Sequence, residues 1–247
     1  MPVFRFVVAL ALGVTMGHAI SSEVRLNGAT TVVNFVVNPF KLEVEKASGH
    51  ALTVVGNATG RGLVDLADGK CDASMVSEPL NIAVEAAAAA GKTVDPAKLV
   101  LTVVKTDEIV FVANKANPVK ALSWTQIRDI HTGKITNWKA VGGKDAPIVV
   151  YSDALTGGTR AMIKHIVMEG QEFGPATKPQ AAVKKAAEMV AGDENGIAGV
   201  GKGFVDTDKS FIIETKKLER PLGFITMGNP TGATASVIAA FIAAARK

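Results

Sequence analysis

Cysteine occurs only once in the 247 residues, at position 71. A single thiol cannot close a disulfide within the chain, so no internal crosslink is expected to stabilise the fold. We interpret Cys71 as a small buried hydrophobic residue rather than a redox or metal group. The histidines His50, His131 and His165 are scattered and have no acidic or cysteine partner at metal-ligand spacing. The sequence therefore predicts neither a metal site nor a cofactor.

The sequence also lacks a large excess of one charge and long apolar runs. The 27 lysines and arginines against 23 acidic residues give a net charge of +4, without a basic block. This mild balance argues against nucleic acid as a partner. No segment approaches the ~20 consecutive apolar residues of a membrane-spanning helix. An apolar content of 48% is nevertheless enough for a sizeable core, in one large domain or two small ones.

The first 19 residues form a segment of their own. Arg5 precedes an apolar run over 6–14, and Gly17 and Ala19 place small residues before a cleavage site after Ala19. This is the pattern of a secretory signal peptide, although an apolar first strand of the fold would look similar. We expect an exported mature chain, and the absence of a cysteine at the cleavage site favours the periplasm as its location.

A strand, a loop of small residues and a helix follow one another repeatedly. The expected strands before such loops are 24–27, 51–55 and 148–151, and the loops are 28–31, 56–62 and 152–159. This alternation predicts an α/β fold whose loops meet at the carboxyl edge of a sheet. A helix start carries about half a positive charge and unpaired N–H groups, so it can bind an anion. The competing interpretation is that Thr30, Thr31, Thr59 and Thr159 only cap their helices.

Two lobes are expected from candidate crossover strands. The β-branched runs Leu99–Val104 and Glu108–Ala113 could carry the chain from one lobe to the other, and Gly196–Val200 could return it. The first lobe would then comprise 20–104 plus 201–247, and the second 105–200. Helices are expected at 31–48, 63–67, 80–90, 123–133, 159–168, 179–191 and 236–245, and further strands at 71–76 and 222–227.

A specific motif adds to this pattern. The stretch GKITNW at 133–138 is followed by VGG at 141–143 and by the third small-residue loop. With these features the chain resembles the phosphate-type substrate-binding proteins of ABC transporters across nearly all of its mature length. Gly28–Thr31, Gly56–Leu63 and Asp72–Leu80 match ligand segments of that family, and Asn195–Val200 matches a further one. The resemblance implies a type II periplasmic binding fold, with an α/β lobe on each side of a ligand cleft that closes like a hinge.

The resemblance also implies a ligand set and no catalytic residue. The residues expected to bind ligand are Ala29, Thr30, Thr31, Thr59, Gly60, Arg61, Ser77, Glu78, Thr156, Gly157, Gly158 and Thr159. Arg61 could equally be a solvated surface residue. Glu78 stands where the phosphate binders carry an aspartate, and its carboxylate would accept a hydrogen bond from the O–H of a protonated oxyanion. A salt bridge at the rim of the cleft is its alternative role.

The chain departs from the family at the third loop. Tyr151 stands where the phosphate binders usually have an arginine, and Ala154-Leu155-Thr156 alters the loop itself. The guanidinium group is lost unless Arg61 or Arg160 supplies it. Asp153 could be a ligand group, but we expect it to hold the loop in an Asx turn.

The leading hypothesis is a periplasmic, monomeric solute-binding protein that captures a small oxyanion, phosphate first, for an ABC transporter permease. A ligand sensor of the same fold that docks onto a receptor or signalling partner is an alternative, as is a binder of another anion. An enzyme is not expected, because no Ser/His/Asp set, carboxylate pair or metal cluster falls on the predicted loop ends.

Overall fold

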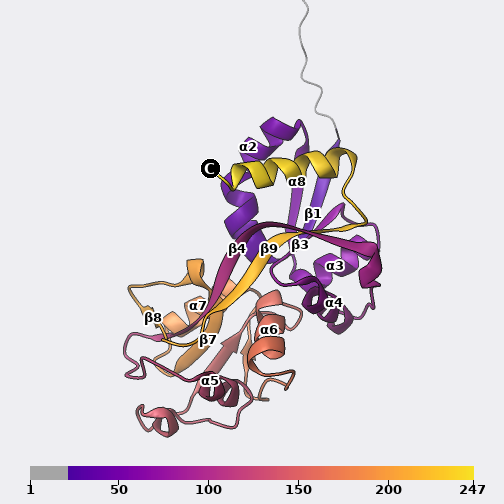
Figure 1. Cartoon of the computed structure of the whole chain (residues 1–247). Helices are drawn as coiled ribbons and strands as arrows, with labels where there is room; N and C mark the ends of the chain where they lie inside the picture. The colour runs from indigo at the N-terminus through magenta and orange to yellow at the C-terminus, as the bar shows by residue number, and fades with distance from the viewer. Residues whose placement is uncertain (1–21) are drawn as a thin grey trace, which may run out of the picture.

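The computed structural model describes residues 22–247 (Figure 1). The expected signal peptide lies outside these residues. Within 22–247, none of the helices has the length and apolar content needed to cross a membrane. The strands are β1 (Glu23–Gly28), β2 (Ala51–Gly56), β3 (Ala73–Val76), β4 (Leu99–Asn114), β5 (Val149–Ser152), β6 (Lys178–Pro179), β7 (Gly196–Gly201), β8 (Ser210–Ile212) and β9 (Leu218–Met227).

The α-helices begin close to the ends of strands. They are α1 (Thr30–Val32), α2 (Asn38–Ser48), α3 (Thr59–Ala67), α4 (Leu80–Ala89), α5 (Trp124–His131), α6 (Gly158–Met162), α7 (Val183–Ala191) and α8 (Gly232–Ala244). A π-helical turn, η1 (Val33–Val37), joins α1 to α2 just before Pro39, and η4 (Ile163–Val167) extends α6. Short 3-10 turns lie at η2 (Pro96–Lys98), η3 (Trp138–Val141) and η5 (Lys202–Phe204).

Two parallel groups of strands are joined by a long antiparallel pair. The sheet order is β2-β1-β3-β9-β4-β7-β5-β6, and β8 pairs with β4. β1 is parallel to β2 and β3, while β5 is parallel to β6 and β7. β4 and β9 run antiparallel to each other and pass from one group to the other (Figure 1). The expected two-lobed α/β fold is therefore confirmed.

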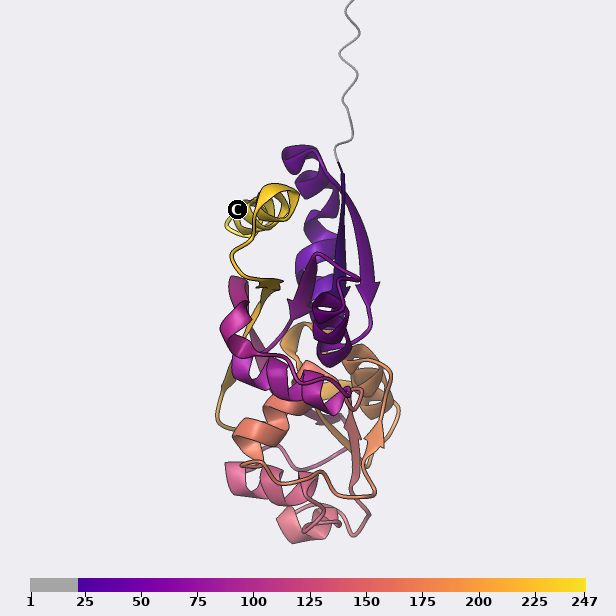
Figure 2. The ribbon, with the colours of Figure 1, turned by 90° about the vertical axis from the view of Figure 1, so that its right-hand side faces the viewer.

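Each lobe has its own buried apolar core. In the first lobe, Leu26, Met75 and Phe224 pack under α2 and α8. In the second lobe, Phe111 and Trp138 are fully buried. Seen at right angles in Figure 2, the molecule is elongated, and α4 of the first lobe lies beside α6 of the second at their junction. The two lobes are thus in contact through these two helices.

Cys71 is buried in the first lobe, and this burial raises the pKa of its thiol to about 11. The side chain therefore behaves as the small apolar residue that the sequence predicted.

The crossovers differ from expectation in two places. The runs Leu99–Val104 and Glu108–Ala113 form one strand, β4, with a bulge between Val103 and Lys105. Gly196–Val200 does not return to the first lobe, because β7 lies fully buried between β4 and β5. Its small residues instead make room for neighbours, since a Cβ on Gly199 would lie 2.3 Å from Ile163 Cδ1.

The chain also stays in the second lobe after β7. β8 pairs with the end of β4, and Ile213 and Leu218 belong to the cluster of Trp138. The segment 202–217, which the sequence assigns to the first lobe, packs with the second. We propose that the return crossing is β9, near Arg220.

Candidate functional site

Three small-residue loops meet in a cavity between the lobes, as the repeated strand–loop–helix pattern predicted. Its free volume is about 10 Å³, room for roughly one water molecule, so the loops pack closely around it. We call it the threonine cavity, and its lining is Ala29, Thr30, Thr31, Ala58, Thr59, Ser77, Asp153, Ala154, Gly157, Gly158, Thr159, Ala181, Ala182 and Val183. Because β1, β3 and β5 end here, both lobes contribute to its wall.

Eight of the twelve predicted site residues line this cavity. They are Ala29, Thr30, Thr31, Thr59, Ser77, Gly157, Gly158 and Thr159. The other four do not line it. The Gly60 N–H donates to the Thr156 carbonyl at 3.1 Å and so joins the lobes, Arg61 is exposed, and Glu78 lies behind the lining. Ligand contact by any of the twelve remains a prediction.

The hydroxyl groups of the cavity are not used as helix caps. Thr31, Thr59 and Thr159 are buried, yet no side-chain cap bond is made at the starts of α1, α3 and α6. The Thr59 hydroxyl has no hydrogen bond of good geometry within residues 22–247. The simple capping interpretation therefore does not explain these threonines.

The backbone at the cavity is strained in one place. Ala58, directly before α3, has φ 73°, a conformation that a side chain with a Cβ rarely adopts. Such strain costs about 1–3 kcal/mol and clusters at ligand sites. Two helix glycines bring backbones close together beside it. A Cβ on Gly60 would lie 2.2 Å from the Ala86 carbonyl oxygen, and one on Gly62 would lie 2.4 Å from Gly28 Cα.

Glu78 is completely buried behind Ser77 and Gly158. Its Oε2 accepts hydrogen bonds from the Ser77 N–H and hydroxyl, both at 3.0 Å, and Oε1 has no partner within residues 22–247. Burial raises the pKa of Glu78, opposed by the hydroxyls of Thr59 and Ser77 and by the charge of Arg220. A salt bridge at the exposed rim does not fit a side chain with 0% exposure.

Asp153 is the second buried carboxyl group, and it lines the cavity directly. It is 5% exposed, and its Oδ1 has no hydrogen bond within the described residues. Burial raises its pKa to about 7, with a small addition from Glu78, while Arg220, Arg160 and the Arg160 N–H oppose the rise. The loop folds tightly over it, since a Cβ on Gly157 would lie 2.0 Å from Asp153 Oδ2. The loop-holding role expected for Asp153 remains a prediction.

The buried guanidinium group comes from a residue that the sequence analysis missed. Arg220 on β9 is 1% exposed. It donates from Nε and Nη2 to Asp107 Oδ2 at 3.0 and 2.8 Å, and from Nη1 to Thr159 Oγ1 at 2.6 Å. Asp107 is its register partner on β4. Arg220 lies two residues from Leu218 and two from Leu222, and this alternation was the available sign that its side chain is buried.

The two arginines considered as substitutes lie elsewhere. Arg61 is exposed, and Arg160 donates to Ser152 Oγ at 2.7 Å while its guanidinium stacks 3.8 Å from the Phe173 ring centre. Tyr151, at the family's arginine position, donates to Asp193 Oδ2 at 2.9 Å. Arg220 of β9 is therefore the arginine that brings a positive charge to the third loop from a distant part of the chain.

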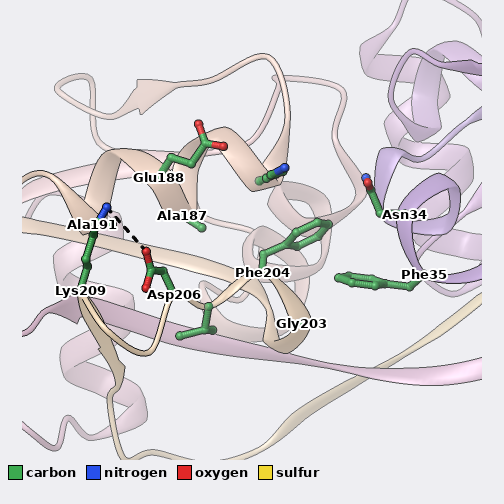
Figure 3. Close-up of a pocket in the computed structure, with 11 residues that line it drawn as sticks. Asn34, Phe35, Ala187, Glu188, Ala191, Gly203, Phe204, Asp206 and Lys209 are labelled. Atoms are coloured by element: carbon green, nitrogen blue, oxygen red, sulfur yellow. Dashed lines mark ion pairs between the residues drawn. The ribbon is translucent and has the colours of Figure 1, made fainter. Parts of the chain in front are cut away.

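A larger hollow of about 520 Å³ lies beside the threonine cavity (Figure 3). Phe35 of the first lobe packs against Phe204 of the second in its wall, with ring centres 4.5 Å apart. Its wall includes Lys184, the residue after Val183 of the threonine cavity. None of the predicted ligand residues lines this hollow. The threonine cavity is therefore the candidate functional site.

No group of three or more His, Cys, Asp or Glu side chains in residues 22–247 is placed to hold a metal ion. His131 is buried, with Nδ1 2.8 Å from the Ile127 carbonyl oxygen, and burial lowers its pKa to about 4. It is a neutral core residue.

Known proteins are similar to this chain in sequence and in fold. A segment of 67 residues is 39% identical to the phosphate-binding protein PstS of Bacillus subtilis, covering 26% of this chain and 22% of the relative. The chain thus matches about a fifth of that protein's length. A structure from Clostridium perfringens, described as a phosphate ABC transporter substrate-binding protein with bound phosphate, aligns with a TM-score of 0.75 and 25% identity, over 88% of this chain and 92% of that one.

The fold is shared more widely. A Vibrio cholerae ABC-type phosphate transport receptor aligns with a TM-score of 0.68 at 22% identity, over 89% of this chain and 93% of that one. The family model described as the PBP superfamily domain matches residues 14–241. The chain belongs to the PBP superfamily.

Proposed function

We propose that this protein captures a small oxyanion, phosphate first, in the threonine cavity and delivers it to an ABC transporter permease. The observation that carries the proposal is the lining itself, in which buried hydroxyls and helix starts from both lobes surround a small cavity. The phosphate binders among the relatives support the choice of ligand. We also propose that the mature chain acts as a monomer in the periplasm after loss of its signal peptide.

Calorimetry of the mature protein tests the ligand. Phosphate, arsenate, sulfate, molybdate and a few carboxylates are titrated, and we expect phosphate or arsenate to bind best. Thr59→Val removes one hydroxyl of the lining at constant size and should weaken binding about 10- to 100-fold, the value of a hydrogen bond to a charged group. Thr207→Val, on an exposed turn, is the matched control and should change nothing.

A thermal melt gives an independent reading. A ligand held between the lobes stabilises the folded state by ~2.7 kcal/mol at a hundred times its dissociation constant. For a chain of this size that corresponds to a rise in Tm of roughly 5–10 °C. If no oxyanion at millimolar concentration moves the melt, the proposal is wrong.

A further inference from the structure

The ionisable side chain that lines the threonine cavity is an acid. Within residues 22–247 the lining contains no lysine or arginine, and Asp153 is its one charged residue. Asp153 is buried, and its Oδ1 has no hydrogen-bond partner among the described residues. A buried polar atom left without a partner is costly, so this oxygen is available for a ligand.

Charged groups face Asp153 from three elements. They are Arg220 on β9, Arg160 on α6 and Glu78 between β3 and α4. Arg220 is already engaged with Asp107 and Thr159, and Arg160 with Ser152. With Asp107 included, three carboxyl groups stand against two guanidinium groups. If all were ionised, the site would carry a net negative charge before an anion entered.

Such a site would repel a dianion unless a proton entered with it. Charges interact strongly in a buried site, where the effective dielectric constant is well below that of water. One proton on a carboxyl group removes a negative charge and also converts an acceptor into an O–H donor. Glu78 is less suited to this contact, because it lies behind Ser77 and Gly158 and does not line the cavity.

We propose that Asp153 is protonated in the ligand complex and donates a hydrogen bond to the bound oxyanion. This inference rests on the proposed function, and it adds that a proton is bound together with the oxyanion. The protein takes up one proton whenever it binds at a pH where free Asp153 is ionised. The raised pKa of about 7 agrees with this, because it places the uptake near neutral pH.

Calorimetry in two buffers of different ionisation enthalpy counts the protons. Phosphate is titrated at about pH 8, roughly one unit above the Asp153 pKa, where most free phosphate is the dianion. The wild-type protein should take up about one proton per ligand. Asp153→Asn, whose amide donates without a proton, should take up about none and bind roughly tenfold more tightly than wild type at this pH. Below about pH 6 the two affinities should converge.

Asp208→Asn, at an exposed position, is the matched control and should behave as wild type. The proposal is overturned if the wild-type protein takes up no proton, a measurement that needs no variant. It is also overturned if Asp153→Asn takes up as many protons as wild type, which would move the proton to another group such as Glu78. Either result leaves intact the proposal that the protein binds an anion. If no oxyanion binds to any of the three proteins, the proposed function fails first.

Discussion

Arg220 brings a guanidinium group into the interior at the junction of the lobes. Its ion pair with Asp107 is fully buried on the arginine side and 13% exposed on the aspartate side. Removing one member of such a pair leaves an uncompensated charge and costs about 3–5 kcal/mol. We expect Arg220→Met to lower the free energy of unfolding by that amount in urea titrations, and to weaken ligand binding because Thr159 loses its donor.

The double variant Asp107→Leu/Arg220→Met provides the control. It removes both charges, so it should recover much of the lost stability while leaving binding weak. A loss below about 1 kcal/mol in Arg220→Met alone would contradict this account of the pair.

Gly158 is required by its contact with Glu78. A Cβ there would lie 1.8 Å from Glu78 Oε2 and 2.7 Å from Ser77 Oγ, and both of these residues are buried. We expect Gly158→Ala to abolish oxyanion binding in calorimetry, because the third loop must move. Gly192→Ala is the matched control, since its nearest neighbours would be 3.8 Å away and its φ is −100°. Wild-type affinity in Gly158→Ala would show that the loop is not fixed by Glu78.

Some residues of the site could be predicted from the sequence, and others could not. Thr30, Thr59 and Thr159 lie in local motifs at the ends of strands, so the sequence predicted their approach to one cavity. Arg220 reaches Thr159 only through the pairing of β9 with β4, a register between residues 113 positions apart. Without an alignment or a structure, no local pattern carries that information.

The start of α5 shows an element that the sequence predicted well. Ser123 Oγ accepts the Gln126 N–H at 3.1 Å, and Gln126 Oε1 accepts the Ser123 N–H at 2.8 Å, so a capping box begins the helix that the sequence predicted from residue 123. Ser123→Ala should cost ~1 kcal/mol and lower Tm by roughly 2–4 °C. Ligand affinity should not change, because Ser123 does not line the threonine cavity. A melt and a titration of the same variant check both parts.

Other elements show where sequence patterns mislead. Glycine is a poor helix former, so Gly60 and Gly62 suggested a loop up to Leu63. In the structure α3 begins at Thr59, and these glycines let its backbone approach α4 and β1. Likewise, the polar residues 105–107 suggested a break, whereas they form the bulged middle of β4. Tertiary packing overrode local propensity in both cases.

At the scale of the whole molecule, contacts across the cleft place the lobes against each other. The Gly60–Thr156 hydrogen bond and the Phe35–Phe204 ring contact both join first-lobe residues to second-lobe residues. The sequence predicted two lobes from its candidate crossover strands, and a ligand cleft from the resemblance of its motifs to a known family. It did not predict which faces of the two lobes meet, because Phe35 and Phe204 belong to no motif. The need for a glycine at position 203 is evident only when the position of the Phe35 ring is known. A Cβ on Gly203 would lie 2.6 Å from Phe35 Cζ.

Stability should depend on pH through the buried titratable groups. Asp153 has its pKa raised from 3.8 to about 7, so between these values the folded state binds more protons than the unfolded state. Its contribution is therefore fully present below about pH 4 and is lost as the pH rises through about 7. His131 acts in the opposite direction, because its pKa is lowered from 6.5 to about 4 and folding releases its proton between those values. The two effects partly cancel in the wild-type protein.

Comparing variants separates the two groups, because His131 contributes equally to wild type and to Asp153→Asn. The difference in unfolding free energy between these proteins should shift in favour of Asp153→Asn by roughly 4 kcal/mol between about pH 4 and pH 8, since each pKa unit is worth ~1.4 kcal/mol. Urea unfolding at several pH values without ligand measures this difference. Asp208→Asn, at an exposed site, should show a difference from wild type that is independent of pH. An equally flat difference for Asp153→Asn would mean that Asp153 is ionised in the folded protein at the same pH as in the unfolded chain, and that its burial is relieved by water or by movement of the loop.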